Sequence, residues 1–463
     1  MPSRREQIQS HQYAMQRVVG AFVSGEAEPA AEPDRRLGTA ALAGLLVAAV
    51  VLAGAGVYGL LRPGGNSGWK REDAVVIERE TGTRFVYRGG TLYPVANFSS
   101  AVLAVGRATE PVIVSRASLA GTARGPLIGI AGAPDALPAA DRLLRDAWSM
   151  CVTSGRDSGG ATTVTSELLV ARAPAGGTDL GEAGLLVREN SSQKVYLVWH
   201  GRRFAINSKQ ALTALNVDAQ PRIPVADAWL NTVPVGLQVA QPPVEGRGKA
   251  STPLPNLLVG QVITAGGSGY LVRQADLLPL TPVEQAMILA DPNTASAYPN
   301  ATPAAKTVQA ADIANVTRAT RPPASDLDPP AQPPAMANAD AARMICTTFA
   351  DGQATPKFVI NADPRLETGI ATNGSATDLV ADRVVVPPAA GVLVRSAQSS
   401  EAGSGTLFLV TDQGRRFALA GADTPAWLGY GSVKPIELPA YVVARIPAGP
   451  ALDPRAARRP LTG

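Results

Sequence analysis

The sequence predicts an α+β protein that is mainly β. A single N-terminal transmembrane helix is followed by an extracytoplasmic region in which four small repeat domains surround a central domain. Three observations predict this fold class. The stretch Leu37 to Leu61 contains no charged residue, a hairpin pattern recurs four times after it, and the only two cysteines lie far apart in the same region.

The uncharged stretch is long enough to cross a membrane as a helix. Helices rise about 1.5 Å per residue, so even Ala40 to Leu61 would measure about 33 Å, against a hydrocarbon core of about 30 Å. A cleaved signal peptide is the alternative, with small residues at Ala53 to Ala55, but the apolar core is too long and begins too late. Basic residues favour a cytosolic N-terminus, because Arg4, Arg5, Arg17, Arg35 and Arg36 precede the span while only Arg62, Lys70 and Arg71 follow it closely.

Cys151 and Cys346 both follow the predicted span. Such a pair suits one disulfide formed in an oxidising compartment, where closing a long loop is worth about 4 to 5 kcal/mol in the chain-entropy model. Two buried free thiols are the alternative. A zinc site is excluded, because it needs four closely spaced ligands and the chain has two cysteines and two histidines.

Composition describes a turn-rich exterior with enough residues for two or three domains. Charged residues make up 17% and aromatic residues 5%, while 45 glycines and 39 prolines are present. The net charge of +4 is mild, and basic residues do not form a run with interleaved aromatic residues. We therefore expect no nucleic-acid partner.

The recurring pattern consists of two short strands joined by a tight turn. Phe85 to Val95 aligns without a gap on Tyr196 to Ile206. Tyr270 to Leu280 keeps the initial aromatic residue and the proline of the first copy, and Phe408 to Leu419 has one extra turn residue. The second and fourth copies share the sequence Gly-Arg-Arg-Phe-Ala. The copies are unevenly spaced, which excludes a solenoid and indicates small modules around a central body.

Each hairpin has a predicted strand before it and a predicted short helix after it. The strands are Ala74 to Glu78, Gly184 to Arg188, Val259 to Ile263 and Gly391 to Arg395. The helices are Ser99 to Val105, Ser208 to Leu215, Pro282 to Leu289 and Pro425 to Gly429. A repeat unit of three strands and a short helix follows.

These patterns predict the division of the chain. It comprises a cytosolic helix and linker (1–36), the span (37–62), a linker (63–73), four repeats (74–110, 184–220, 258–290, 389–433), three parts of the central domain (111–183, 221–257, 341–388), a linker rich in Pro and Ala (291–340) and a C-terminal segment (434–463). The linker 291–340 reads as extended and draped on the surface, and the tail from Ala448 as extended and solvated. Arg4 to Val23 reads as a helix that docks a partner or lies on the membrane.

Catalytic motifs are missing from the sequence. The nearest approach to a nucleotide-binding loop, Gly64 to Arg71, has the wrong spacing, and Gly266 to Gly269 is better explained as a hairpin turn before Tyr270. A Ser or Cys nucleophile needs a base, and the only exterior histidine, His200, falls in a repeat turn. We predict no catalytic, cofactor-binding or metal-binding residues, and no cofactor.

Longer motifs resemble one known family. They are Arg-Gly-Pro-Leu-Ile-Gly-Ile-x-Gly-Ala-Pro-Asp-x-Leu (Arg124 to Leu137), Trp148-x-x-Cys151, Leu92 to Asn97, Tyr196 to Arg203, Val259 to Val262, Leu428 to Gly431 and Gly449 to Pro454. With the span before them, these motifs resemble EccB, the B component of the membrane core of type VII (ESX) secretion systems. The resemblance covers nearly the whole chain.

The resemblance implies an actinobacterial inner-membrane subunit with a cytoplasmic N-terminus and a periplasmic C-terminal region. It implies a Cys151 to Cys346 disulfide that staples the central domain. It also implies a structural role in protein export, with EccC, EccD, EccE and copies of the chain itself as partners in a membrane complex. Members have been labelled ATPases, so an ATP-hydrolysing component is the alternative function, and a cell-wall-binding module built on the repeats is another.

Overall fold

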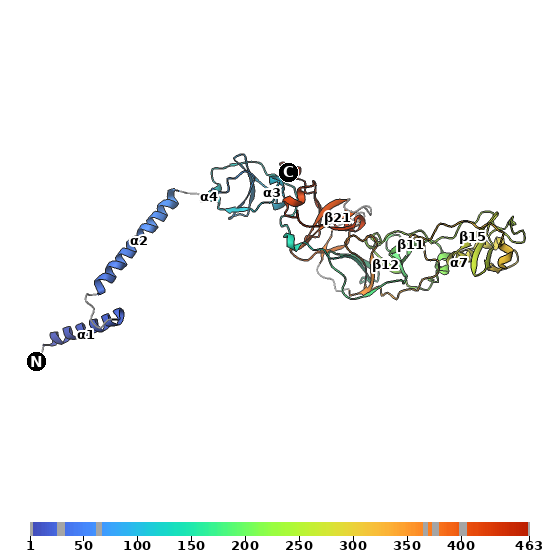
Figure 1. Ribbon diagram of the computed structural model, residues 1–463, viewed down its shortest axis with the longest axis horizontal. Helices are drawn as coiled ribbons and strands as arrows, with labels where there is room; N and C mark the ends of the chain where they lie inside the picture. Colours follow the sequence, from blue (N-terminus) through green and yellow to red (C-terminus); the bar gives the residue numbers. More distant parts are fainter. Residues whose placement is uncertain are drawn as a thin grey trace. The chain divides into compact units, whose positions relative to one another are not determined.

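The computed structural model describes residues 3–25, 33–61, 67–363, 369–372, 379–397 and 405–461. The chain forms two compact units, with residues 1–83, 87–92 and 111–124 in the first and residues 84–86, 93–110 and 125–463 in the second. Two N-terminal helices lead into a series of small β-sheets (Figure 1). The predicted fold class, mainly β with one N-terminal apolar helix, is confirmed.

The N-terminal helices are α1 (Arg4–Ser24) and α2 (Pro33–Leu61). Helix α1 begins at a capping box, in which Ser3 N donates to Glu6 Oε2 at 2.7 Å, and it ends at Gly25, whose φ of 71° is left-handed. It therefore extends one residue beyond the predicted Arg4 to Val23. Helix α2 includes all of Leu37 to Leu61.

Each repeat region contains a small sheet with the predicted hairpin inside it. The first sheet has the order β4-β1-β2-β3-β5, and the other three have the orders β11-β10-β9-β12, β15-β14-β13-β16 and β23-β22-β21-β24. The strands are β1 (Ala74–Glu78), β2 (Arg84–Arg88), β3 (Thr91–Pro94), β4 (Val112–Val114), β5 (Ala123–Arg124), β9 (Leu185–Glu189), β10 (Val195–Trp199), β11 (Arg202–Ile206), β12 (Ile223–Val225), β13 (Val262–Ala265), β14 (Ser268–Val272), β15 (Leu277–Leu280), β16 (Lys306–Thr307), β21 (Gly391–Ala397), β22 (Thr406–Thr411), β23 (Arg416–Ala418) and β24 (Ile436–Pro439).

The repeat helices lie close to their predicted positions. They are α3 (Phe98–Val105), α5 (Lys209–Ala214), α7 (Pro282–Ala290) and α8 (Thr424–Trp427). The predicted turn at Gly266 and Gly267 is also present, with φ of 57° and 82°. Positive φ at both central residues is the turn geometry whose twist matches a β-hairpin, and glycine adopts it without steric cost.

Each sheet also contains a parallel strand that the sequence analysis did not anticipate. In each case the strand pairs with the first strand of its repeat: β4 with β1, β12 with β9, β16 with β13 and β24 with β21. A short helix follows it in three repeats, namely α4 (Arg116–Leu119), α6 (Asp227–Leu230) and α9 (Ala440–Val443), and the third has a 3-10 turn (Ala310–Ile313) instead. The repeat unit is therefore longer than the predicted three strands and one helix.

The chain then returns and forms backbone hydrogen bonds with the last strand of the hairpin, a pairing called the clasp below. In the second repeat Arg203 N donates to Pro234 O at 2.8 Å, and Gly236 N donates to Arg203 O at 2.9 Å. The fourth repeat has the same two hydrogen bonds, from Arg416 N to Pro447 O and from Gly449 N to Arg416 O. These bonds place a glycine directly over the aromatic ring that follows the paired arginine.

Two repeat helices pack on each other in the second unit. Val283 and Met287 of α7 belong to the same buried cluster as Ala211 and Ala214 of α5. Helix α3 likewise contacts α8, together with a helix near the C-terminus, α10 (Pro454–Ala457). Arg458 Nε donates to Ala104 O at 2.9 Å and so satisfies a carbonyl at the end of α3.

The prediction of an extended, solvated tail is therefore wrong at Leu452 and at α10, which pack against the protein. Leu452 and Ala457 are fully buried, and Leu461 N donates to Leu127 O at 2.9 Å. The prediction failed because three arginines make this segment look solvated, while its few apolar residues find partners far back along the chain.

The central part is a seven-stranded sheet of order β19-β20-β7-β6-β17-β18-β8. Its strands are β6 (Trp148–Arg156), β7 (Thr162–Leu169), β8 (Thr178–Asp179), β17 (Met344–Phe349), β18 (Lys357–Ala362), β19 (Ile370–Ala371) and β20 (Arg383–Val385). The largest buried cluster joins Trp148 and Met150 of this sheet to Val187 of the second repeat and Val392 of the fourth. These three sheets thus share one core.

The predicted linker 291–340 divides into two parts with different structures. Its first part belongs to the third repeat: Ile313 is buried in that repeat's core, and the hydroxyl of Tyr298 accepts a hydrogen bond from Val262 N at 2.8 Å. Its second part is held by backbone hydrogen bonds such as Leu237 N to Leu327 O at 2.7 Å. The linker prediction is wrong for the first part because the Pro-rich and Ala-rich composition concealed these few buried residues.

Candidate functional site

Helix α2 is the most distinctive functional element of the first unit. Its segment Gly38–Tyr58 has a mean hydropathy of 2.4, and none of it is buried inside the protein. Leu45 and Leu52 are 74% and 72% exposed. An apolar helix of about 32 Å that the described residues leave unburied requires another apolar environment, which a bilayer provides.

The disulfide lies in the middle of the central sheet. Cys346 of β17 stands directly opposite Cys151 of β6, and their sulfur atoms are bonded. Both residues are fully buried, in a cluster that includes Leu169, Met344 and Val385. The bond therefore joins two neighbouring strands, and the bonded residues are 195 positions apart in the sequence. The expected disulfide is present.

His200 occupies the hairpin turn in which the sequence places it. Its φ is 45°, its ring stacks on Trp199 with centroids 3.6 Å apart, and its Nε2 lies 2.6 Å from Oε2 of Glu182. It lines a cavity of about 220 Å³ together with Thr355 and Lys357. A serine or cysteine nucleophile is not among the lining residues of this cavity.

The stretch that resembles a phosphate-binding loop has another structural role. Residues 64–66 lie outside the described residues, but Trp69 is fully buried and packs edge-on against Tyr87, with ring centroids 5.2 Å apart. Lys70 Nζ lies 5.5 Å from the centroid of the Trp69 ring. Within the described ranges, no group of three or more His, Cys, Asp or Glu residues could hold a metal ion.

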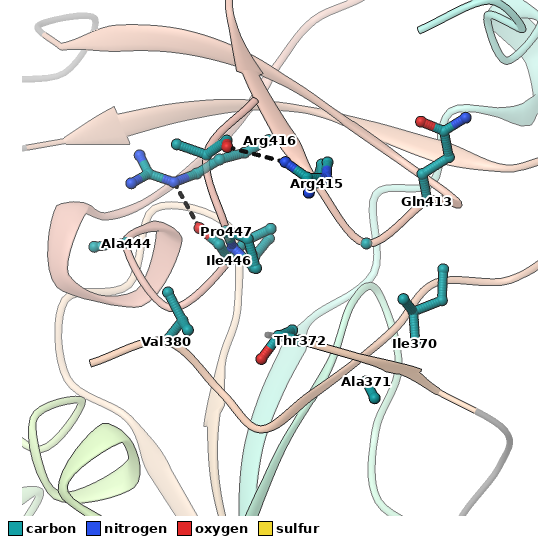
Figure 2. A pocket seen from close by; sticks show the side chains of 12 residues that line it. Ile370, Ala371, Thr372, Val380, Gln413, Arg415, Arg416, Ala444, Ile446 and Pro447 are labelled. Carbon is teal, nitrogen blue, oxygen red and sulfur yellow. Dashed lines mark hydrogen bonds between the residues drawn. The ribbon is translucent and has the colours of Figure 1, made fainter. Parts of the chain in front are cut away.

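A cavity of about 490 Å³ lies beside the β22–β23 turn of the fourth repeat (Figure 2). Arg415 and Arg416 line it on one side, and Ile370, Thr372 and Val380 line it on the other. Arg416 Nε donates to Ile446 O at 2.8 Å, and its guanidinium stacks on the Phe408 ring. Burial lowers the pKa of Arg416.

Sequence reasoning did not single out this cavity. The available signal was the sequence Gly-Arg-Arg-Phe-Ala, shared by the second and fourth repeats. That motif alone does not show that the surroundings of the two arginine pairs differ, because the residues that differ lie far away along the chain.

The sheets from β1 to β24, with the disulfide in the central one, are called the β-body below. Together with the apolar helix, the β-body defines a membrane-anchored protein built from small β-repeats. A family model described as type VII secretion system ESX-1, transport TM domain B, matches residues 1–461. The chain belongs to this family. Family membership and the apolar helix support a location in the inner membrane.

Relatives of known name resemble the chain over most of its length. The ESX-2 secretion system ATPase EccB2 of Mycobacterium tuberculosis is 30% identical over 92% of this chain and 88% of the relative. The ESX-3 secretion system ATPase EccB3 of Mycolicibacterium smegmatis is 27% identical over 97% of this chain and 89% of the relative.

Solved structures share the fold. A chain in an intact ESX-5 inner membrane complex gives a TM-score of 0.63 at 23% identity, covering 100% of this chain and 96% of that chain. A chain in the EccB3 dimer from the ESX-3 core complex gives a TM-score of 0.62 at 24% identity, covering 83% and 99%. At this level of identity the comparison supports the architecture.

Proposed function

We propose that this chain is a structural subunit of a type VII secretion core in the inner membrane, where it takes part in the export of proteins. Helix α2 anchors it, α1 lies in the cytosol, and the β-body lies on the outer side of the membrane. The observation that supports the proposal is the family match over residues 1–461, combined with the candidate span Gly38–Tyr58 and the disulfide-bonded β-sheets that follow it.

The proposed partners are EccC, EccD, EccE and further copies of the chain. Helix α1 is a suitable docking element because its apolar side chains are exposed: Phe22 is 90% exposed, and Ile8 and Met15 more than half. These residues recur every seven positions, which places them on one side of a helix. The opposite side carries few basic residues, unlike a helix that lies on anionic lipid, so we favour a groove on a partner protein.

Affinity purification of the tagged full-length chain in mild detergent tests this proposal. We expect the other core components to copurify, and Ile8→Ala/Met15→Ala/Phe22→Ala to release those held by α1. Tyr13→Ala is the matched control, since Tyr13 is 65% exposed but lies about half a turn away from that side. Purification of the unmodified chain without any core component would contradict the proposal.

ATP hydrolysis is the second candidate function, because the printed names of the relatives contain the word ATPase. Phosphate-binding loops surround the nucleotide with backbone N–H groups and supply a lysine. Lys70, the only lysine of the loop-like stretch, instead lies over Trp69. We therefore favour the structural role.

A further inference from the structure

The Gly-Arg-Arg-Phe-Ala motif places an arginine pair in the same position of the second and fourth repeats. Arg202 and Arg203 in the second repeat correspond to Arg415 and Arg416 in the fourth, and the sequences stay aligned without a gap to Val239 and Leu452. Both inner arginines stack on an aromatic ring, Arg203 on Tyr196 and Arg416 on Phe408. The two sites can therefore be compared atom by atom.

In the second repeat the protein itself supplies acceptors for both guanidinium groups. Arg203 Nη1 donates to Leu230 O at 2.8 Å, and its Nη2 donates to Asn231 Oδ1 at 3.1 Å. Arg202 Nη2 forms an ion pair with Asp326 Oδ2 at 2.5 Å. Both arginines are thus satisfied within the chain.

In the fourth repeat the two side-chain acceptors have no counterpart among the described residues, although Val443 stands at the position of Leu230 and keeps its carbonyl oxygen. Ala444 stands at the position of Asn231, and among the described residues the side chain of Arg416 has one hydrogen bond, from Nε to Ile446 O. Arg415 reaches only Ala448 O, at 3.4 Å. Neither arginine has a carboxylate partner among the described residues, and the cavity of about 490 Å³ takes the place of the missing groups (Figure 2).

A third guanidinium belongs to the same segment, although it does not line the cavity. Arg445 lies between Ala444 and Ile446, which both line the cavity, and it is only 7% exposed. Its Nη1 is buried without a hydrogen-bond partner among the described residues. Burial lowers the pKa of Arg445, and so does the neighbouring charge of Arg416. An anion in the cavity would compensate for the charge of Arg416, which is partly buried and has no carboxylate partner among the described residues.

We propose that this cavity binds a phosphate group through Arg415 and Arg416. Guanidinium groups bind phosphate with two parallel hydrogen bonds, and two guanidinium groups match the double charge of a phosphate monoester or of inorganic phosphate. A single carboxylate would neutralise only one of them. This site is independent of the secretion role proposed above.

Equilibrium dialysis of the full-length protein in detergent with labelled inorganic phosphate at low salt tests the proposal. We expect one saturable site per chain. Arg415→Gln and Arg416→Lys should each weaken phosphate binding by about tenfold, because each removes a guanidinium that forms bidentate hydrogen bonds with the phosphate. Ala444→Asn should weaken it as strongly, because it gives Arg416 the internal acceptor that Arg203 already has. Arg202→Gln is the matched control and should leave binding unchanged.

Arg415 is exposed and Ala444 lies at the cavity wall, so neither variant should prevent folding even if Arg416→Lys does. Competition then identifies the chemistry that is recognised. Free phosphate and a phosphate monoester should displace the label, whereas acetate at equal ionic strength should not. Equal displacement by acetate, equal binding by all variants, or no saturable binding would each overturn the proposal.

Discussion

At the scale of single residues, the best-defined requirement is the close approach of glycine to an aromatic ring in the repeat clasp. A Cβ added at Gly236 would lie 2.3 Å from Cε1 of Phe204, and one added at Gly449 would lie 2.3 Å from Cε1 of Phe417. Gly125 stands over Tyr93 in the same way. The third repeat has Leu278 in place of the ring and Ala319 in place of the glycine. Glycine and aromatic ring therefore occur together for a steric reason.

We expect Gly236→Ala to destabilise the protein by about 1 to 3 kcal/mol, because the new methyl group must displace a fully buried ring. Gly155→Ala is the matched control, since its Cβ would meet only Thr163 Oγ1, at 3.5 Å. Denaturant unfolding of both variants measures the difference. Equal stability of the two would show that the clasp tolerates a side chain.

Glu284 gives a second prediction at this scale, for the dependence of stability on pH. Burial alone would raise the pKa of this carboxyl, but hydrogen bonds from Arg321, at 2.6 and 2.7 Å, and from Thr281 outweigh burial and lower the pKa below its ordinary value of 4.5. A lowered folded-state pKa adds stability that is present above about pH 4.5 and is lost as the pH falls through the folded-state value.

We therefore expect Glu284→Gln to cost about 1 to 3 kcal/mol at pH 7 and progressively less toward pH 3. Urea unfolding at several pH values measures this, with the exposed Glu245→Gln as control. A cost that does not change with pH would mean that the charge of Glu284 is not responsible.

At the scale of elements, α2 is the candidate membrane span, and the disulfide joins strands β6 and β17 of the central sheet. Helix α2 exposes apolar side chains all round, whereas the helices of the repeats bury theirs. The disulfide joins strands that are already paired and aligned, so its main contribution is to restrict the unfolded chain.

A reporter that is active only outside the cytosol should work when fused after Gly68 and fail when fused after Gly25. This result would establish the proposed topology, and the reverse pattern would refute it. Val50→Arg should impair insertion by about 2.5 to 3.5 kcal/mol on translocon scales, because it places a charge near the middle of the span.

Removing the disulfide should lower stability without affecting the arrangement of the repeats. For Cys346→Ser we expect a loss of about 2 to 5 kcal/mol, measured by denaturant unfolding under oxidising conditions. Under reducing conditions the variant and the unmodified protein should become nearly equal. A difference that persists after reduction would mean that packing of the sulfur atoms, rather than the bond, is responsible.

At the scale of the whole molecule, packing joins the central sheet to the second and fourth repeats and the second repeat to the third. One core joins the central sheet to the second and fourth repeats, and helix packing joins α5 to α7. The segment that follows the third repeat forms backbone hydrogen bonds with the second repeat. In the same segment, Arg321 forms an ion pair with Glu284 of α7. Such an arrangement suits the structural role proposed above.

ATP hydrolysis by the purified full-length protein separates the two candidate functions. We expect a rate no higher than that of a blank, and no change in Lys70→Ala, because Lys70 contacts Trp69 rather than a phosphate-binding loop. Turnover that survives removal of contaminants and is lost in a point variant would establish an enzyme instead.

The sequence by itself determined the features that depend on local patterns. The span follows from the lack of charges between Leu37 and Leu61, and the hairpins follow from alternating apolar residues and turn glycines such as Gly266 and Gly267. The strand before the hairpin was predictable in three repeats, because its boundaries depend on nearby residues, whereas β13 begins three residues later than predicted.

Only the tertiary structure decided which distant segments complete each repeat. The parallel strand β12, the clasp at Gly236 and the buried tail at Leu452 are short and lack a periodic pattern, and their partners lie far away along the chain. The arginine cavity is the same kind of feature. The motif at Arg415 and Arg416 is visible in the sequence, but the loss of its acceptor becomes apparent only when Ala444 is seen beside it, because contacts of this kind depend on long-range packing rather than on local preference.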